Sequence, residues 1–94
     1  MTKDLTNLTI LITGSGNGIG QSHAVLMAER GADIIVHDIS LKGVTETISL
    51  IKKNGSNARP FVMDIRDTDA FQKAIIKFGP IDILVNNAGV GGKG

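Results

Sequence analysis

Several residue types are missing or scarce in this sequence. It contains no cysteine, no tryptophan and no tyrosine, and only three phenylalanines. Without cysteine, neither a disulfide framework nor a cysteine-based metal site can form. The two histidines, His23 and His37, lack carboxylates at metal-ligand spacing, so we expect no metal site and interpret both as packing or surface residues. Without tyrosine, a mechanism that needs a tyrosine acid or base cannot be carried by this chain alone.

Excess charge and long apolar runs are scarce as well. The formal net charge is +1, which gives no reason to expect nucleic acid or an acidic membrane surface as a partner. No apolar run approaches the length that spans a membrane, and residues 1–7 lack the apolar core of a signal peptide. We therefore expect a cytoplasmic protein. Its 94 residues allow one small domain at most, and its 41% of hydrophobic residues predicts that it folds.

The most informative stretch is an apolar run that leads into a glycine-rich turn, ILITGSGNGIG at residues 10–20. Its glycine spacing is G-x-x-x-G-x-G, not the G-x-G-x-x-G of the general dinucleotide pattern. Glycines permit a tight turn and a close ligand, and a helix start offers free N–H groups to a phosphate. A flexible loop or an ordinary turn is the alternative. The candidate cofactor contacts here are Gly14, Ser15, Asn17, Gly18, Ile19 and Gly20.

Strand-like and helix-like segments alternate along the chain. We expect strands at residues 8–13, 34–37, 61–63 and 81–85, and helices at residues 18–30, 41–54 and 68–78. This alternation predicts right-handed βαβ crossovers and a parallel sheet in the order 3-2-1-4. That is the first half of a Rossmann-type, doubly wound α/β fold. Its fourth strand would be an open apolar edge, through which the chain could self-associate.

Asp38 ends the second expected strand, 24 residues after Gly14. A carboxylate there can accept hydrogen bonds from both ribose hydroxyls of an adenosine and would repel a 2′-phosphate. No lysine or arginine adjoins it, since Ile39 follows, and Asn17 in the glycine turn is also uncharged. These features favour NAD over NADP. A helix-capping or solvated aspartate is the alternative.

Polar residues also follow the third and fourth strands. Asp64 could accept from the adenine amino group beside the backbone of Ile65, or it could be a turn aspartate. Asn86 and Asn87 could line the ribose, although tying strand ends together is at least as important a role. The candidate contacts after the later strands are Asp38, Ile39, Asp64, Ile65, Asn86, Ala88 and Gly89.

Together these segments resemble the short-chain dehydrogenase/reductase family. Thr13-Gly14-x-x-x-Gly18-Ile19-Gly20 is similar to its cofactor loop, Asp64-Ile65 to its adenine-contacting pair, and Asn86-Asn87-Ala88-Gly89 to its fourth-strand signature. The resemblance implies a nicotinamide cofactor and reversible oxidation of an alcohol to a carbonyl. In this family, an acid like Asp38 marks NAD preference.

The family's catalytic Ser, Tyr and Lys lie beyond the Asn-Asn-Ala-Gly segment, so no catalytic residue can be assigned here. We therefore expect residues 1–94 to be the N-terminal NAD-binding half of a Rossmann domain, inactive by itself, with the substrate half absent. A small alcohol or carbonyl substrate would bind only to a longer parent protein. The alternatives are a nucleotide-binding module without chemistry and a truncated fragment without an independent role.

Overall fold

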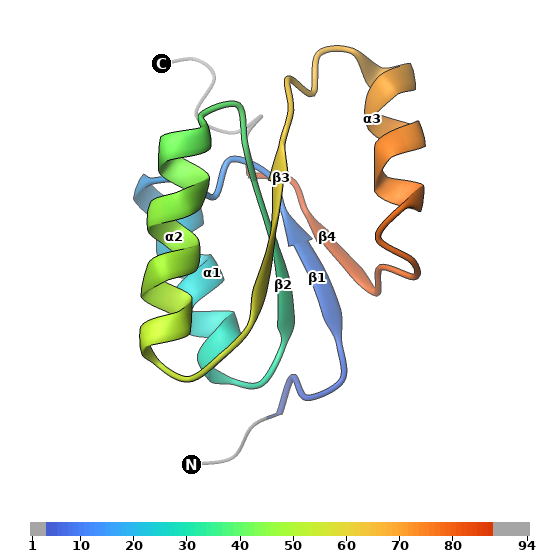
Figure 1. Ribbon diagram of the computed structural model, residues 1–94. Coiled ribbons are helices and arrows are strands. Elements are labelled where there is room, and N and C mark those ends of the chain that lie inside the picture. The colour runs from blue at the N-terminus through green and yellow to red at the C-terminus, as the bar shows by residue number, and fades with distance from the viewer. Residues whose placement is uncertain (1–3, 88–94) are drawn as a thin grey trace.

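The computed structural model describes residues 4–87, which form a four-stranded parallel sheet with helices on both faces (Figure 1). The strands are β1 (Thr9–Ile12), β2 (Asp33–Asp38), β3 (Ala58–Val62) and β4 (Ile83–Val85). The helices are α1 (Gly18–Glu29), α2 (Leu41–Lys53) and α3 (Thr68–Ile76). In this part of the chain, no helix has the length and apolar character needed to cross a membrane.

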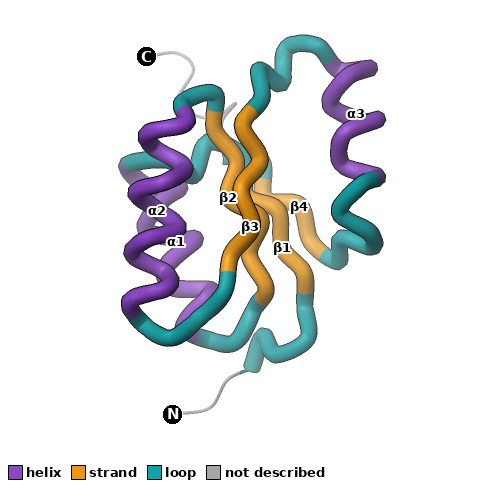
Figure 2. The backbone as a smooth tube through the Cα atoms, viewed as in Figure 1, coloured by secondary structure: helices purple, strands orange, loops and turns teal. Residues whose placement is uncertain are grey.

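The strand order is β3-β2-β1-β4, and every pair is parallel, which confirms the predicted Rossmann-type half. The chain starts in the middle of the sheet, moves outward through β2 and β3, and then crosses back to place β4 beside β1. Helices α1 and α2 lie together on one face, and α3 lies on the other (Figures 1 and 2). The order therefore reverses between β1 and β4, where such sheets open a crevice for ligands.

The larger core lies between the sheet and the helix pair α1 and α2. Ile10 and Ile12 of β1 and Ile34 and Val36 of β2 are fully buried there. Small residues at every fourth position of a helix predict a smooth face that packs on a sheet, and in α1 these are the buried residues: Gly20, Ala24 and Ala28. Their small side chains let the helix lie close on the sheet, so the start of α1 is held firmly against the strand ends.

The spacing of Leu41, Val44, Ile48 and Ile51 predicts one buried face of α2, and most of this face is confirmed. Leu41 is the exception, since it is 66% exposed, and Ile48 is partly buried against the core. The buried positions are Val44, Thr47 and Ile51. The apolar spacing indicated the helix correctly. It could not indicate Thr47, because a polar threonine can be buried only when its hydroxyl forms a hydrogen bond.

A smaller cluster on the opposite face consists of Leu11, Ile35 and Phe61, covered by side chains of α3 and its following turn. The rings of Phe61 and Phe71 are stacked with centroids 5.6 Å apart. No residue of α3 is fully buried. The helix ends at Ile76, earlier than predicted. An aspartate just before a helical segment predicts an N-cap, and this is confirmed, since the Asp67 carboxylate accepts from Ala70 N–H at 3.1 Å.

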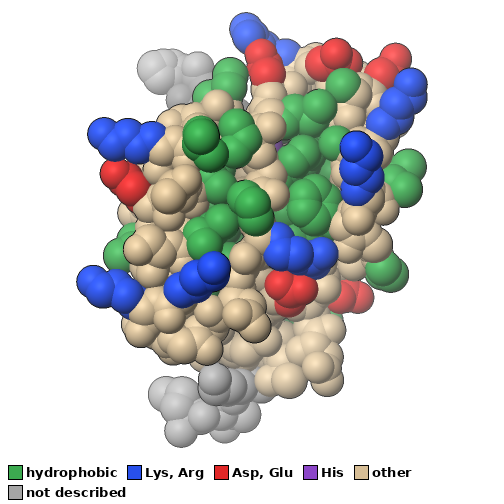
Figure 3. Space-filling model, in the orientation of Figure 1, with side chains coloured by type: hydrophobic (Ala, Val, Ile, Leu, Met, Phe, Trp, Pro, Cys, Tyr) green, Lys and Arg blue, Asp and Glu red, His purple; other side chains and the backbone are tan. Residues whose placement is uncertain are grey.

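The prediction for β3 was wrong in position, since the strand starts three residues earlier than expected and ends at Val62. In the sequence, Pro60 predicts the start of an edge strand, because proline lacks an N–H for a second neighbour, but it lies inside β3. Because β3 pairs only with β2 among the described strands, Pro60 can lack an N–H on its open side without breaking the ladder. Hydrophobic side chains gather over β3 and the flanking α2 and α3 on the face shown in Figure 3.

Strand β4 is short and pairs on one side only among the described residues. Asp82 anchors its start to β1, because its carboxylate accepts from Thr9 N–H at 2.8 Å and its own N–H donates to the Thr9 carbonyl at 2.9 Å. Ile83 and Leu84 are 40% and 53% exposed. The edge is thus open and apolar, as expected, and self-association through it stays a prediction.

We expect Ile51→Ala to lower the free energy of unfolding by about 2–5 kcal/mol, because it leaves a cavity under α2. The neighbouring substitution Leu50→Ala removes a 41% exposed side chain and should cost less than about 1 kcal/mol. Urea unfolding followed by far-ultraviolet circular dichroism measures both, since the chain has no tryptophan or tyrosine for fluorescence. Equal losses for the two variants would contradict this placement of the core.

Candidate functional site

The segments that follow the four strands meet at the carboxyl edge of the sheet. Ser15, after β1, donates its backbone N–H to the His37 carbonyl at 2.7 Å. Thr13, also after β1, donates from its hydroxyl to Oδ1 of Asn86 at 3.2 Å. Met63, after β3, donates its N–H to the Asp38 carbonyl at 3.1 Å. The structure therefore brings together the polar residues that the sequence placed at separate strand ends.

The glycine loop leads directly into the start of α1. Gly14 and Gly18 adopt left-handed backbone angles, with φ of 66° and 58°. Asn17 occupies the N-cap position, and its side chain makes no capping hydrogen bond. Among residues 4–87, no acceptor lies against the N–H groups of Gly18, Ile19 and Gly20. These donors and the positive end of the helix dipole form a site suited to a phosphate.

Two other glycines are required by close contacts. A Cβ on Gly20 would lie 2.2 Å from the carbonyl oxygen of Gly14, so α1 can start here only without a side chain. A Cβ on Gly16 would lie 2.7 Å from Oδ2 of Asp38. Sequence reasoning did not select Gly16, although its place in the glycine loop was a signal. Gly43 of α2 likewise packs on the loop, since its Cβ would lie 3.0 Å from the carbonyl oxygen of Gly16.

Asp38 stands at the end of β2 and faces this loop. Its Oδ2 accepts from Gly16 N–H at 2.9 Å, and its Oδ1 accepts from Ile39 N–H at 2.8 Å and from Ser40 N–H at 3.4 Å. Within the described residues its carboxylate forms no ion pair. Backbone donors therefore fix a negative charge beside the helix start, and each oxygen keeps capacity for a further donor.

The hydroxyl of Ser15 points into the protein. It is fully buried, donates to the Ile12 carbonyl at 2.7 Å and accepts from the backbone N–H of His37 at 3.1 Å. Ser15 thus locks the glycine loop to β1 and β2. The expected contact of Ser15 with a cofactor stays a prediction, and its hydroxyl already has partners within the protein.

The ring of His37 joins two further segments of the edge, which the sequence-based interpretation of an ordinary packing or surface residue did not foresee. Gly14 N–H donates to Nδ1 at 3.1 Å, and Nε2 lies 2.7 Å from the Met63 carbonyl oxygen. This pattern assigns the proton to Nε2. Burial lowers the pKa of His37 below its ordinary value of 6.5, against the bond to Met63 and the charge of Asp38, which raise it. The signal in the sequence was a polar ring in a buried strand beside an acid.

A polar network beneath the loop was also missed. Thr47 of α2 is fully buried, and its hydroxyl donates to the Ser15 carbonyl at 2.7 Å. The amide of Gln21 donates to the Thr47 hydroxyl at 2.9 Å and to the Gly16 carbonyl at 3.3 Å. These bonds satisfy loop carbonyls that would otherwise be buried without partners. They also hold the loop beside the start of α1, where the N–H groups of Gly18, Ile19 and Gly20 have no acceptor among the described residues.

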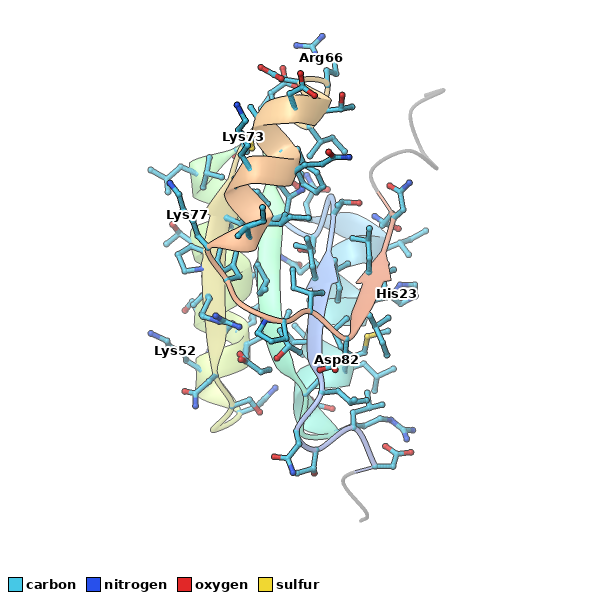
Figure 4. All side chains as sticks on the ribbon, turned by 90° about the vertical axis from the view of Figure 1, so that its right-hand side faces the viewer. His23, Lys52, Arg66, Lys73, Lys77 and Asp82 are labelled. Atoms are coloured by element: carbon cyan, nitrogen blue, oxygen red, sulfur yellow. The ribbon has the colours of Figure 1, made fainter. Side chains whose placement is uncertain are left out.

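Asp64 follows β3 and forms an ion pair with Arg66, which Figure 4 shows projecting at this end of the molecule. Nη2 of Arg66 lies 2.6 Å from Oδ2, and the Arg66 backbone N–H donates to Oδ1 at 3.0 Å. These bonds lower the pKa of Asp64 to about 2. Because the Arg66 side chain is 87% exposed, it can move aside at little cost. A contact of Asp64 or Ile65 with adenine stays a prediction.

The asparagines after β4 tie strand ends together, which is the structural role that the sequence suggested. Besides the bond between Asn86 and Thr13, Nδ2 of Asn87 donates to the Gly14 carbonyl at 3.3 Å. Ala88 and Gly89 lie outside the described residues. Within the described part of the chain, no three histidine, aspartate or glutamate side chains gather as they would around a metal ion.

A polar hollow of about 790 Å³ lies at the other end of the sheet, between the last turns of α1 and α2 and the start of β3. Arg59 lies at its border. A scattered arginine is usually interpreted as a solvated surface charge, but Arg59 donates to Asp33 at 3.0 Å and to the Phe78 carbonyl at 3.2 Å. The hollow faces the amino ends of the strands. Ligands of such sheets bind at the carboxyl ends, so the glycine loop and Asp38 remain the candidate site.

Comparisons with known proteins agree with this geometry. The family model described as short chain dehydrogenase matches residues 8–94. An uncharacterized oxidoreductase of Thermotoga maritima is 46% identical over 83 residues, which are 86% of this chain and 33% of that protein. The chain spans about a third or less of the length of the curated relatives it matches.

Two solved structures share the fold. A short chain dehydrogenase from Mycobacterium paratuberculosis bound to NAD has 33% identity and a TM-score of 0.78, over 88% of this chain and 37% of that one. The citronellol catabolism dehydrogenase AtuB of Pseudomonas aeruginosa PAO1 has 27% identity and a TM-score of 0.87, over 92% of this chain and 38% of that one. Since the family model covers nearly the whole sequence, this chain belongs to the short chain dehydrogenase family.

Proposed function

We propose that residues 1–94 are the N-terminal, NAD-binding half of a dinucleotide-binding domain, in an oxidoreductase that interconverts an alcohol and a carbonyl. One observation carries this proposal: the start of α1, which has no side-chain cap, lies beside the Asp38 carboxylate at the same edge of the sheet. The family, and a relative whose structure was solved bound to NAD, support it.

The residues present fit such a cofactor. The N–H groups at the start of α1 would receive the pyrophosphate, and the close Gly20–Gly14 contact leaves the backbone bare where it must approach. Asp38 would accept from the ribose hydroxyls, and Asp64 and Asn86 would lie toward the adenine and the second ribose. When bound, the nicotinamide ring supplies the hydride acceptor or donor.

Charge favours NAD over NADP in this proposal. Asp38 would meet a 2′-phosphate as a like charge, which is repulsive at close range. The neighbouring candidates Asn17 and Ile39 are uncharged. Neither of these two residues would offset the charge of a 2′-phosphate.

By itself the chain is proposed to bind the cofactor without turning over substrate. The family resemblance places its catalytic Ser, Tyr and Lys beyond the Asn-Asn-Ala-Gly segment, and these 94 residues contain no tyrosine. The alcohol or carbonyl would then be bound by a longer parent protein. Formation of NADH by the pure chain in the presence of alcohols would contradict this part of the proposal.

We expect Asp38→Ala to weaken NAD binding by roughly tenfold to a hundredfold, the range for a hydrogen bond to a charged group. NADP binding should be weaker than NAD binding in the unaltered chain, and the difference should shrink in the variant. Titration calorimetry of the 94-residue chain with each nucleotide measures both. Glu46→Gln, which alters an exposed acid on α2, serves as the control. If the folded chain binds neither nucleotide, the proposed cofactor role of this chain is wrong.

We expect Gly20→Ala to remove most NAD affinity, because the new methyl group would lie 2.2 Å from the Gly14 carbonyl oxygen and would force the loop away from α1. Gly79→Ala is the matched control: its φ of 79° is strained for alanine, but no atom lies within 4 Å of the new Cβ. It should lower stability while leaving NAD affinity unchanged. Calorimetry and urea unfolding separate the two effects, and a Gly20→Ala chain that bound NAD normally would show that the close contact is dispensable.

A further inference from the structure

The imidazole of His37 connects two parts of the candidate cofactor edge that are far apart in sequence, the glycine loop and the end of β3. We propose that His37 is a positioning residue for the dinucleotide: its neutral Nδ1 fixes the turn at Gly14, and protonation of the ring releases this turn and weakens binding. This inference rests on the proposed function for its ligand, NAD. The hydrogen bond between Gly14 and His37 comes from the structure alone.

The turn at Gly14 controls the start of α1. Gly14 has a left-handed φ of 66°, and its carbonyl oxygen is the atom against which Gly20 packs and to which Asn87 donates at 3.3 Å. The Gly14 N–H, on the other side of the same residue, donates to His37. One acceptor on the ring therefore holds the residue whose carbonyl oxygen packs against the start of α1.

The ring has little freedom to adopt another arrangement. It is 3% exposed and lies edge-on to Phe61 and Phe71, with centroid distances of 5.4 and 6.1 Å. Its Nε2–H donates to the Met63 carbonyl at 2.7 Å. If the ring turned over to present its other nitrogen to Gly14, the hydrogen bond to the Met63 carbonyl would break. The two bonds thus require the neutral ring with its proton on Nε2.

Protonation adds an N–H at Nδ1, which would then point at the N–H of Gly14. Two donors cannot share a hydrogen bond, so the loop and ring must separate. Asp38, the next residue of β2, is the charged group that raises the pKa of His37. Phe61 of β3, Met63 just after β3 and Phe71 of α3 carry no charge. Asp64, beyond Met63, is held in its ion pair with Arg66.

The direction of the pH effect follows from burial, the largest influence, which lowers the pKa of His37 in the folded state below its ordinary value of 6.5. The unfolded chain therefore binds the proton more readily than the folded one. The stabilising effect of the neutral ring is fully present above about pH 6.5 and is lost as the pH falls through the lower, folded pKa.

The first experiment needs no ligand. In the 94-residue chain, NMR titration should show the Gly14 amide resonance moving with the same midpoint as the His37 ring protons. The protection of the Gly14 amide against hydrogen exchange, measured relative to the intrinsic rate at each pH, should fall as the ring is protonated. A Gly14 amide that does not follow the His37 titration would overturn the proposal.

The second experiment measures NAD affinity by calorimetry above and below the midpoint found by NMR. The affinity should fall by about threefold to tenfold on protonation of His37, the equivalent of one hydrogen bond. His37→Asn places an amide oxygen near the position of Nδ1 and should keep the affinity while abolishing its pH dependence. His37→Gln, whose amide reaches toward Met63 instead, should show the weak affinity already at neutral pH.

His23 is the control, since it is the other histidine in the sequence and is exposed on α1, as Figure 4 shows. His23→Asn should retain the full pH dependence. If His37→Asn retained it as well, the proposed coupling would be wrong. If the unaltered chain bound no NAD at any pH while Gly14 still followed His37, the positioning role would stand and the proposed function would fail.

Discussion

The structure depends on the junction between the glycine loop and the end of β2. There the backbone of Ser15 donates to His37, the Ser15 hydroxyl bridges β1 and β2, and Gly16 donates to Asp38. These bonds continue the pairing of two parallel strands into the turn that follows them. Because the turn is fixed, α1 starts at a defined place and in a defined direction, with its first N–H groups turned outward.

The second layer of support comes from α2, which begins just after Asp38. Gly43 lets this helix approach the loop backbone. The Thr47 hydroxyl accepts a hydrogen bond from the Gln21 amide and donates one to the Ser15 carbonyl. The polar Thr47 is needed in this otherwise apolar interface because the carbonyls of the loop, unlike those of a strand, have no hydrogen-bond partner on a neighbouring strand. The loop is therefore held by β2, α1 and α2 together.

Much of this arrangement could be predicted from local patterns. The strand order follows from alternating elements and right-handed crossovers, and the buried face of α1 follows from small residues one helical turn apart. The position of Asp38 follows from its offset after the glycines. What could not be predicted depends on partners distant in sequence: the ring of His37 meets Met63, and Thr47 meets Ser15, 32 positions away. For β3, Pro60 indicated an edge strand correctly but misled on where the strand begins, because only the register against β2 fixes its ends.

The bonds that build this edge also prepare it for a ligand. Asp38 is already oriented by backbone donors from Gly16, Ile39 and Ser40, so a ribose would meet a carboxylate with little rotational freedom left to lose. The phosphate-binding end of α1 is equally fixed by the contact of Gly20 with Gly14. In contrast, Asp64 is engaged by an exposed arginine, which would have to move before the proposed adenine contact could form. In the proposed binding mode, the groups for the pyrophosphate and the ribose are therefore preorganised, and the adenine contact is the one that would require rearrangement.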